Sequence, residues 1–180
     1  MTTSIAFAVW ASSITHVCLI EAMKVEDFPK AVQLLQSSAF HHINAQDDAG
    51  QTALHLAARE GNYEICCLIV NHHGFRSCQA LTHPDAKPPS QSALRVAAFA
   101  KDKGHKAKIM EVLLEHANAR LVNLQDSKGN TCLHYACSSG SPSTVQALLS
   151  RGCCDLELKN FKQPSPQKLH SRTHVWLMAF

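Results

Sequence analysis

Histidine and cysteine are the residues of this chain whose side chains could do chemistry, with twelve and eight copies in 180 residues. A thiol beside an imidazole can act as a nucleophile with its base, and grouped thiols or imidazoles can bind a metal ion. Cys132 lies two residues before His134, but no third orienting group or oxyanion element accompanies the pair. The sequence also contains no G-x-x-x-x-G-K-[ST] and no H-E-x-x-H motif. We therefore expect no catalytic residues and no enzyme activity.

The spacing of the same residues argues against a metal site. Cys66-Cys67 and Cys153-Cys154 are adjacent pairs and lack the C-x₂-C spacing that lets two thiolates face one metal ion. His41-His42 and His72-His73 are adjacent too, and neighbours in sequence do not share a helix face. Free buried cysteine packs as a small apolar residue, which suits a reducing compartment. We expect free thiols, no metal and no cofactor.

Two histidines belong to a segment that occurs twice, offset by 79 residues. Residues 44–55 read N-A-Q-D-D-A-G-Q-T-A-L-H, and residues 123–134 read N-L-Q-D-S-K-G-N-T-C-L-H. The D-x-x-G run predicts a turn, because Asp can cap its own backbone and Gly can adopt a positive φ. The Thr that follows stands where a helix N-cap is expected. The apolar spacing beyond it predicts two helices per copy, with a break at Gly61 or Gly140.

The pattern D-x-x-G-x-T-x-L-H-x-A resembles the signature of the ankyrin repeat, a turn plus two helices per roughly 33 residues. The offset fits two such periods with insertions, and residues 92–98 supply a middle copy with the same apolar spacing. The resemblance covers about residues 20–166 and implies an all-α fold, an α-solenoid of stacked helix-turn-helix units with β-turn fingers. It also implies structural roles for Thr52, His55, Thr131 and His134, with the imidazoles bonded to the backbone of the neighbouring turn.

We expect repeat units at about residues 20–42, 43–78, 79–121 and 122–154, with a partial unit at 155–166. Residues 1–19 form an apolar N-terminal lead, and residues 167–180 form an irregular C-terminal tail. Two alternatives account for the apolar end of the chain. It is a truncated form of a longer array, or a hydrophobic tail folds back onto the last helix.

The third unit departs most from its neighbours. Its turn is longer and includes the proline-rich residues 83–89, and Arg95 stands where the other copies have His. Four added residues between Ala97 and Ile109 predict one extra helical turn, which would make the helix pair protrude. Insertions of this kind often lie on a binding face, although neutral drift in a surface loop is the alternative.

Composition limits the partners that this chain can have. A net charge of +3 without a strong Lys/Arg cluster does not favour nucleic acid. No segment approaches the ~20 apolar residues of a membrane span. Only 17% of the residues are charged, so part of the surface is expected to be covered by another protein. We expect a monomer with a protein partner and a cytoplasmic and/or nuclear location.

In the ankyrin family, partners commonly contact the turn tips and the exposed face of each first helix. Carried onto this chain, that resemblance places the partner-binding residues on the second and fourth units, with the third unit adding Lys87 and Phe99. Leu56 and Tyr135, at matching positions of two units, favour binding over a merely solvated face. The complete set is Asp48, Gln51, Leu56, Arg59, Glu60, Lys87, Phe99, Lys128, Asn130, Tyr135, Ser138 and Ser139.

The sequence thus predicts a non-catalytic protein–protein interaction module that acts as an intracellular adaptor, scaffold or inhibitor. Within the family, the insertions and residues 152–161 resemble the IκB-like inhibitors of NF-κB factors, which implies regulation of a transcription factor. Two alternatives stay open. One is a targeting module or truncated isoform of a larger multidomain enzyme or ligase, and the other is a non-functional truncated product.

Overall fold

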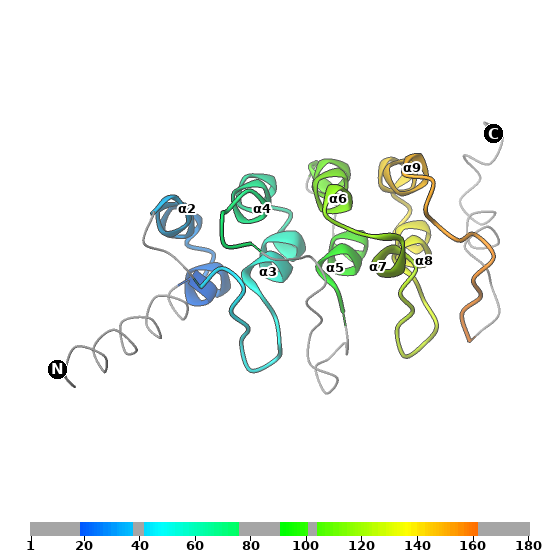
Figure 1. Ribbon diagram of the computed structural model, residues 1–180, viewed down its shortest axis with the longest axis horizontal. Helices are drawn as coiled ribbons and strands as arrows, with labels where there is room; N and C mark the ends of the chain where they lie inside the picture. Colours follow the sequence, from blue (N-terminus) through cyan, green and yellow to red (C-terminus); the bar gives the residue numbers. More distant parts are fainter. Residues whose placement is uncertain (1–18, 38–41, 76–90, 101–103, 162–180) are drawn as a thin grey trace.

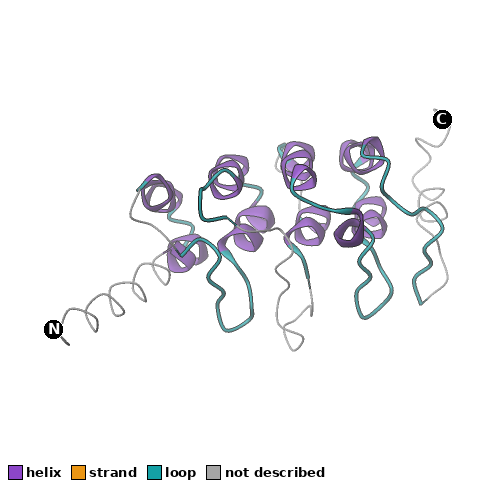
Figure 2. Ribbon diagram, in the orientation of Figure 1, coloured by secondary structure: helices purple, strands orange, loops and turns teal. Residues whose placement is uncertain are grey.

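A computed structural model describes residues 19–37, 42–75, 91–100 and 104–161 of the chain. Within those ranges the elements are helices joined by turns, and no β-strand is found (Figure 2). The predictions for residues 1–18 and 162–180, and for the proline-rich residues 83–89, lie outside the described part.

The helices form two parallel rows of an elongated stack (Figure 1). One row contains α2 (Phe28–Gln36), α4 (Tyr63–Val70), α6 (Lys106–Glu115) and α9 (Pro142–Ser150). The other contains helical residues 19–24, then α3 (Ala53–Glu60), α5 (Ala93–Phe99) and α8 (Cys132–Ser138), with the short α7 (Ala119–Val122) beside it. The turns project below this second row as fingers, so we call it the finger-side row and the first the outer row. The prediction of an all-α solenoid of helix-turn-helix units with turn fingers is confirmed.

Each unit packs its own helix pair and then packs both rows against the next unit. Contacts join α3 to α4, α5 to α6 and α8 to α9 within units, and α3–α5–α8 and α2–α4–α6–α9 along the rows. The buried apolar side chains form one continuous cluster from Leu19 to Leu148. Each unit buries its share of this core against the next unit, so each unit depends on its neighbours for stability.

Local sequence signals start and stop these helices. Asp27 caps α2, which carries Pro29 in its first turn. Asn62 caps α4 and Asn118 caps α7, each by accepting a backbone N–H three residues on. Gly61 ends α3 with a φ of 72°, a left-handed conformation that glycine adopts without strain.

The prediction of an added helical turn in the third unit is wrong. Helix α5 ends at Phe99 and α6 begins at Lys106, so the extra residues lengthen the connection between them. The physical reason lies in Gly104, whose φ of 91° interrupts helical geometry just before α6.

Candidate binding face

The fingers of the second and fourth units are built by the same aspartate. Asp47 Oδ1 accepts the backbone N–H groups of Ala49 and Gln51 at 3.0 and 2.8 Å. Asp126 Oδ1 accepts those of Lys128 and Asn130, both at 2.8 Å. Two turn glycines complete the fingers, with φ of 72° at Gly50 and 76° at Gly129. These bonds fix the turn tips relative to the helix that follows each of them.

His55 ties the second unit to the third. Its Nδ1 accepts the Thr52 backbone N–H at 3.2 Å, so the ring proton is on Nε2, which donates to the Gln91 carbonyl at 3.0 Å. The Thr52 hydroxyl donates to the same Nδ1 at 2.8 Å. His55 is 2% exposed, so these directional bonds lie inside the stack, between a helix start and the next unit. In the fourth unit, His134 makes the same contacts with Thr131.

Arg95 occupies the equivalent position of the third unit and is only 1% exposed. Like His55, Arg95 is the third residue after the helix N-cap, which is Ser92 in this unit. Its Nη1 lies 3.9 Å from Oδ2 of Asp126, in the finger of the fourth unit. A buried cation needs such a counter-charge, so Arg95 and Asp126 join the third and fourth units.

The Asp126 carboxylate accepts hydrogen bonds from several residues. The Tyr135 hydroxyl donates to its Oδ2 at 2.5 Å. Burial alone would raise the pKa of Asp126, but the bonds from Tyr135, Asn130 and Lys128 and the charge of Arg95 lower it below its ordinary value overall. Burial and the same carboxylate raise the pKa of Tyr135, which keeps its hydroxyl protonated as the donor. Burial lowers the pKa of Arg95, and Asp126 opposes that effect.

Lys106 is a second buried cation of the third unit, 4% exposed. Its Nζ donates to the Ser139 hydroxyl at 3.0 Å, and Ser139 is the C-cap of α8. A cation at this end of a helix complements the carbonyl dipoles there. Lys106 therefore links the start of α6 to the end of α8 in the next unit.

Phe99 and Tyr135 form the aromatic part of the finger side. Their rings meet edge to face, with centroids 5.7 Å apart. Phe99 is 64% exposed, although Arg59 and Ser138, at the same helix position in the neighbouring units, are polar. Phe99 is therefore an exposed aromatic residue at a position where the neighbouring units are polar. We define the Phe99–Tyr135 patch as these two rings.

Most of the predicted partner-binding residues lie on the fingers or the finger-side helices and are at least partly exposed. Those that are exposed are Asp48, Arg59, Phe99, Lys128, Ser138 and Ser139; those partly buried are Gln51, Glu60, Asn130 and Tyr135. Lys87 is outside the described residues. The placement of Leu56 on the exposed face is wrong, because its side chain is 1% exposed.

The burial of Leu56 has a simple cause. Helix α3 packs against both α4 and α5, and Leu56 joins the continuous core. Tyr135, at the matching position, has a hydroxyl that reaches Asp126 at the edge of the face. A leucine has no polar tip to direct it there, so it packs inward.

The sequence pattern singled out Arg95 without a contact and predicted the turn role of Asp126, but it did not predict the contacts of Asp126 with Arg95 and Tyr135. It also did not predict the burial of Lys106. Pattern matching can identify Arg95, because a charged residue stands at a position where two other units have a buried imidazole. Nothing in the sequence indicates that Lys106 is buried, because it lies in a basic run that is typical of a solvated loop.

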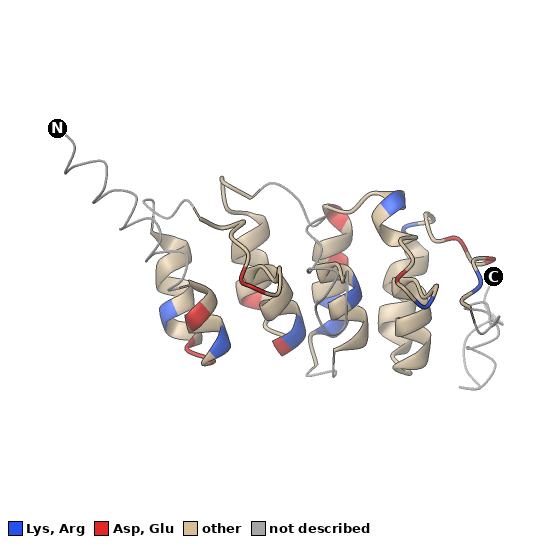
Figure 3. Ribbon diagram, turned by 90° about the horizontal axis from the view of Figure 1, so that it is seen from below, with Lys and Arg blue, Asp and Glu red and all other residues tan. Residues whose placement is uncertain are grey.

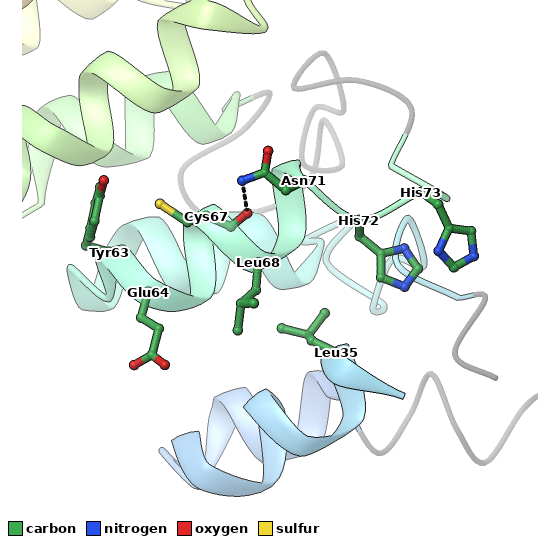
Figure 4. Close-up of a pocket in the computed structure, with 8 residues that line it drawn as sticks. All are labelled: Leu35, Tyr63, Glu64, Cys67, Leu68, Asn71, His72 and His73. Atoms are coloured by element: carbon green, nitrogen blue, oxygen red, sulfur yellow. Dashed lines mark hydrogen bonds between the residues drawn. The ribbon is translucent and has the colours of Figure 1, made fainter. Parts of the chain in front are cut away.

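A groove lies in the outer row between α2 and α4 (Figure 4). It has a volume of about 580 Å³ and is lined by residues that include Leu35, Glu64, Cys67, Leu68 and His72. Glu64 lies in the first turn of α4 and His72 lies beyond the end of that helix, at opposite ends of the groove, so they do not converge on one reacting atom. Figure 4 shows the Cys67 sulfur and the imidazoles in different parts of this groove. The groove lacks the shared geometry of an acid–base or nucleophilic site.

The cysteines of the described ranges are free thiols. Burial raises the pKa of Cys137 to about 11, and burial with neighbouring Cys153 raises that of Cys154 to about 12. Cys132 is shifted upward too, mainly by burial. These three side chains are therefore protonated at neutral pH and are poor nucleophiles. In the described part of the chain, no group of three or more His, Cys, Asp or Glu side chains could hold a metal ion.

None of the helices described is both long and apolar enough to cross a membrane.

Comparison with known proteins identifies the repeat. Family models for ankyrin repeats match residues 73–160 and 27–70. The chain is 31% identical over 129 residues to Inversin of Mus musculus, which covers 71% of this chain and 12% of Inversin. It is 27% identical over 123 residues to Rabankyrin-5 of Homo sapiens, covering 66% of this chain and 10% of that protein. A transient receptor potential cation channel subfamily A member 1 homolog of Caenorhabditis elegans is 28% identical over 124 residues, with coverages of 69% and 9%. The chain thus spans about a tenth of the length of these relatives.

Proposed function

The chain belongs to the ankyrin-repeat family, and from that premise we propose that it is a non-catalytic protein-binding module. Its finger side would contact the partner, through the turn tips and the exposed positions of α3, α5 and α8. In this role the chain acts as an adaptor, scaffold or inhibitor, and it changes the position or availability of its partner without chemistry. The module is a monomer, and its location is cytoplasmic and/or nuclear.

The single observation that carries this proposal is the exposed Phe99, held edge to face against Tyr135. Tyr135 is fixed in turn by its bond to Asp126. An aromatic pair whose orientation is already fixed loses little side-chain freedom when a partner binds. Aromatic side chains of this kind are also enriched among residues that contribute most to binding.

Two more specific functions can be distinguished for this module. One is IκB-like regulation of a transcription factor, which rests on the insertions of the third unit. The other is a targeting module, or a truncated isoform, of a larger multidomain enzyme or ligase. The second is favoured by one observation: the chain aligns with only about a tenth of each relative.

Affinity capture from cell extract tests the proposal. The baits are the parent chain, a variant carrying Arg59→Ala, Phe99→Ala and Lys128→Ala, and a control with Gln146→Ala and Glu111→Ala on exposed outer helices. We expect a stoichiometric partner with the parent and the control, and its loss with the finger-side variant. Capture that is equal for all three baits would place the contact elsewhere. Capture of chaperones alone by all baits would support the non-functional product instead.

A further inference from the structure

Four side chains at the junction of the third and fourth units form a closed circuit of contacts. Arg95 Nη1 lies 3.9 Å from Oδ2 of Asp126, and the Tyr135 hydroxyl donates to the same oxygen at 2.5 Å. The Tyr135 ring meets Phe99 edge to face, with centroids 5.7 Å apart. Arg95 and Phe99 are four residues apart on α5, so they are neighbours on the surface of that helix. The contacts thus return to the helix from which they start, and we call these four residues the Arg95 circuit.

The Arg95 circuit joins a buried group to the partner-binding face. Arg95 is 1% exposed and cannot touch a partner, whereas Phe99 is 64% exposed. The helix pairs of the third and fourth units lie side by side (Figure 3), and α8 and α9 carry no Lys, Arg, Asp or Glu. The carboxylate that Arg95 meets across the junction therefore comes from the fourth finger, where the Tyr135 hydroxyl also binds it.

The junction between the second and third units cannot form the same circuit. The positions equivalent to Arg95, Phe99 and Tyr135 are occupied there by His55, Arg59 and Val96. Val96 has no hydroxyl with which to reach a finger. Arg59 donates within its own unit, to Gln51 at 3.2 Å and to Glu60 at 3.3 Å. The circuit is therefore a specific feature of the third and fourth units.

We propose that the buried Arg95 is a positioning residue of the partner-binding face, because it fixes the orientation of the Phe99 ring. It acts through Asp126 and Tyr135, which complete the circuit. This inference rests on the proposed function and identifies residues that set the affinity for the partner without touching it. A side chain that is ordered before binding loses less conformational entropy in the complex. Opening the circuit should therefore weaken binding while Phe99 itself is still present.

Fluorine NMR of the free chain tests the circuit without a partner. Phe99 is replaced by 4-fluorophenylalanine in the full chain, and Tyr135→Ala supplies the reference signal of a ring that has lost its neighbour. Arg95→Met removes the charge and keeps a long side chain, and Tyr135→Phe removes only the hydroxyl. In both variants we expect the signal from position 99 to move from the parent value toward that of Tyr135→Ala. An unchanged signal in either variant would overturn the proposal.

Affinity capture from cell extract, repeated over a series of bait concentrations, tests the consequence for binding. We expect Arg95→Met to lower the apparent affinity for the captured partner about fivefold, through the lost order of the exposed ring. Tyr135→Phe should change the affinity in the same direction. It opens the circuit without removing the buried cation, so it tests the proposal even where Arg95→Met does not fold.

Two further baits control for loss of stability and for loss of charge. Ile65→Ala opens a cavity in the core of the second unit and lowers stability without touching the circuit. Glu111→Gln neutralises an exposed charge on α6. Circular dichroism confirms that each bait is folded at the temperature of capture, and both controls should bind the partner as the parent does.

The outcomes separate this inference from the proposed function. If Arg95→Met and Tyr135→Phe capture the partner as well as the parent, or lose no more than Ile65→Ala, the positioning role is overturned and the proposed function stands. If the parent captures no partner, the proposed function fails and the positioning role fails with it, whatever the fluorine signals show.

Discussion

The junction between the second and third units and the junction between the third and fourth units use the same helix position in different ways. At the first, neutral His55 donates one hydrogen bond to the Gln91 carbonyl across the junction. At the second, Arg95 places a buried positive charge 3.9 Å from the Asp126 carboxylate. The first link is a directional bond to backbone, and the second is an ion pair inside the stack.

The difference has a consequence for the binding face. Asp47 of the second unit pairs with Lys24, whose side chain is 42% exposed, and it takes no part in holding an aromatic ring. Asp126 joins Arg95 and Tyr135, so the link between units and the orientation of the aromatic patch depend on one carboxylate. A histidine at position 95 could bridge the units but could not supply the charge.

Removal of the buried cation should give the largest effect. Arg95→Ala leaves the Asp126 charge without its counter-ion and opens a cavity, so we expect the free energy of unfolding to fall by about 3 kcal/mol. Urea denaturation followed by circular dichroism measures it. A loss below about 1 kcal/mol would show that the ion pair does not support the junction.

Removal of the neutral link should cost less. His55→Ala deletes the bonds to Thr52 and Gln91 inside the stack, and we expect a loss of about 2 kcal/mol in the same experiment. A larger loss than for Arg95→Ala would reverse the order of the two junctions.

Arg95→His replaces the ion pair between units with a histidine of the kind found at position 55. Asn130 precedes the N-cap of α8 just as Gln91 precedes the N-cap of α5. In Arg95→His, the new imidazole can therefore donate to the Asn130 carbonyl as His55 donates to that of Gln91. We expect about half the loss of Arg95→Ala, because a link between units is restored without the charge. Equal losses for the two variants would mean that histidine cannot replace the ion pair.

Acid should weaken both fingers. The folded pKa of Asp126 is lowered, so its contribution is present above the unfolded value near 4 and is lost as the pH falls below it. Burial would raise the pKa of Asp47, but bonds from Gln51 and Lys24 lower it, so the sign is the same. Unfolding between pH 7 and pH 3 should therefore depend less on pH in Asp126→Asn and in Asp47→Asn than in the parent.

Salt separates these two carboxylates. The exposed partner of Asp47 is screened at 0.5 M NaCl, whereas the buried Arg95 is not. High salt should therefore reduce the difference between parent and Asp47→Asn more than that between parent and Asp126→Asn. An equal reduction in both would contradict the contrast between the two ion pairs.

The smallest effect on stability is expected at the exposed ring. Phe99→Ser removes a side chain that is 64% exposed, so the unfolding free energy should change by less than about 0.5 kcal/mol. Thermal unfolding of the two chains checks this value. A large loss would assign Phe99 to the core, and the binding defects of its variants would then have a structural explanation.

Local signals were sufficient to predict the repeat, the helix starts and the fingers. Asp, Gly and Thr at fixed spacing each act within about four residues, so the sequence pattern contains the relevant contacts. The contact of His55 with the next unit followed only from the family resemblance. The boundaries assigned to the units stay predictions.

Features set by contacts between units could not be predicted. Leu56 and Tyr135 share a helix position, and their different burial depends on which helices and polar atoms surround them. The burial of Lys106 depends on Ser139, 33 residues away in the next unit. The edge-to-face contact of Phe99 with Tyr135 likewise joins α5 of one unit to α8 of the next. Such pairings become visible only when the stack is assembled.

Site-specific photo-crosslinking shows whether the partner contacts the finger side. A benzophenone amino acid is placed at position 99 of the full chain, and in a second chain at position 63 on the outer row. After irradiation in cell extract, we expect one discrete protein adduct from position 99 and none from position 63. Adducts from position 63 alone, or from neither position, would contradict it.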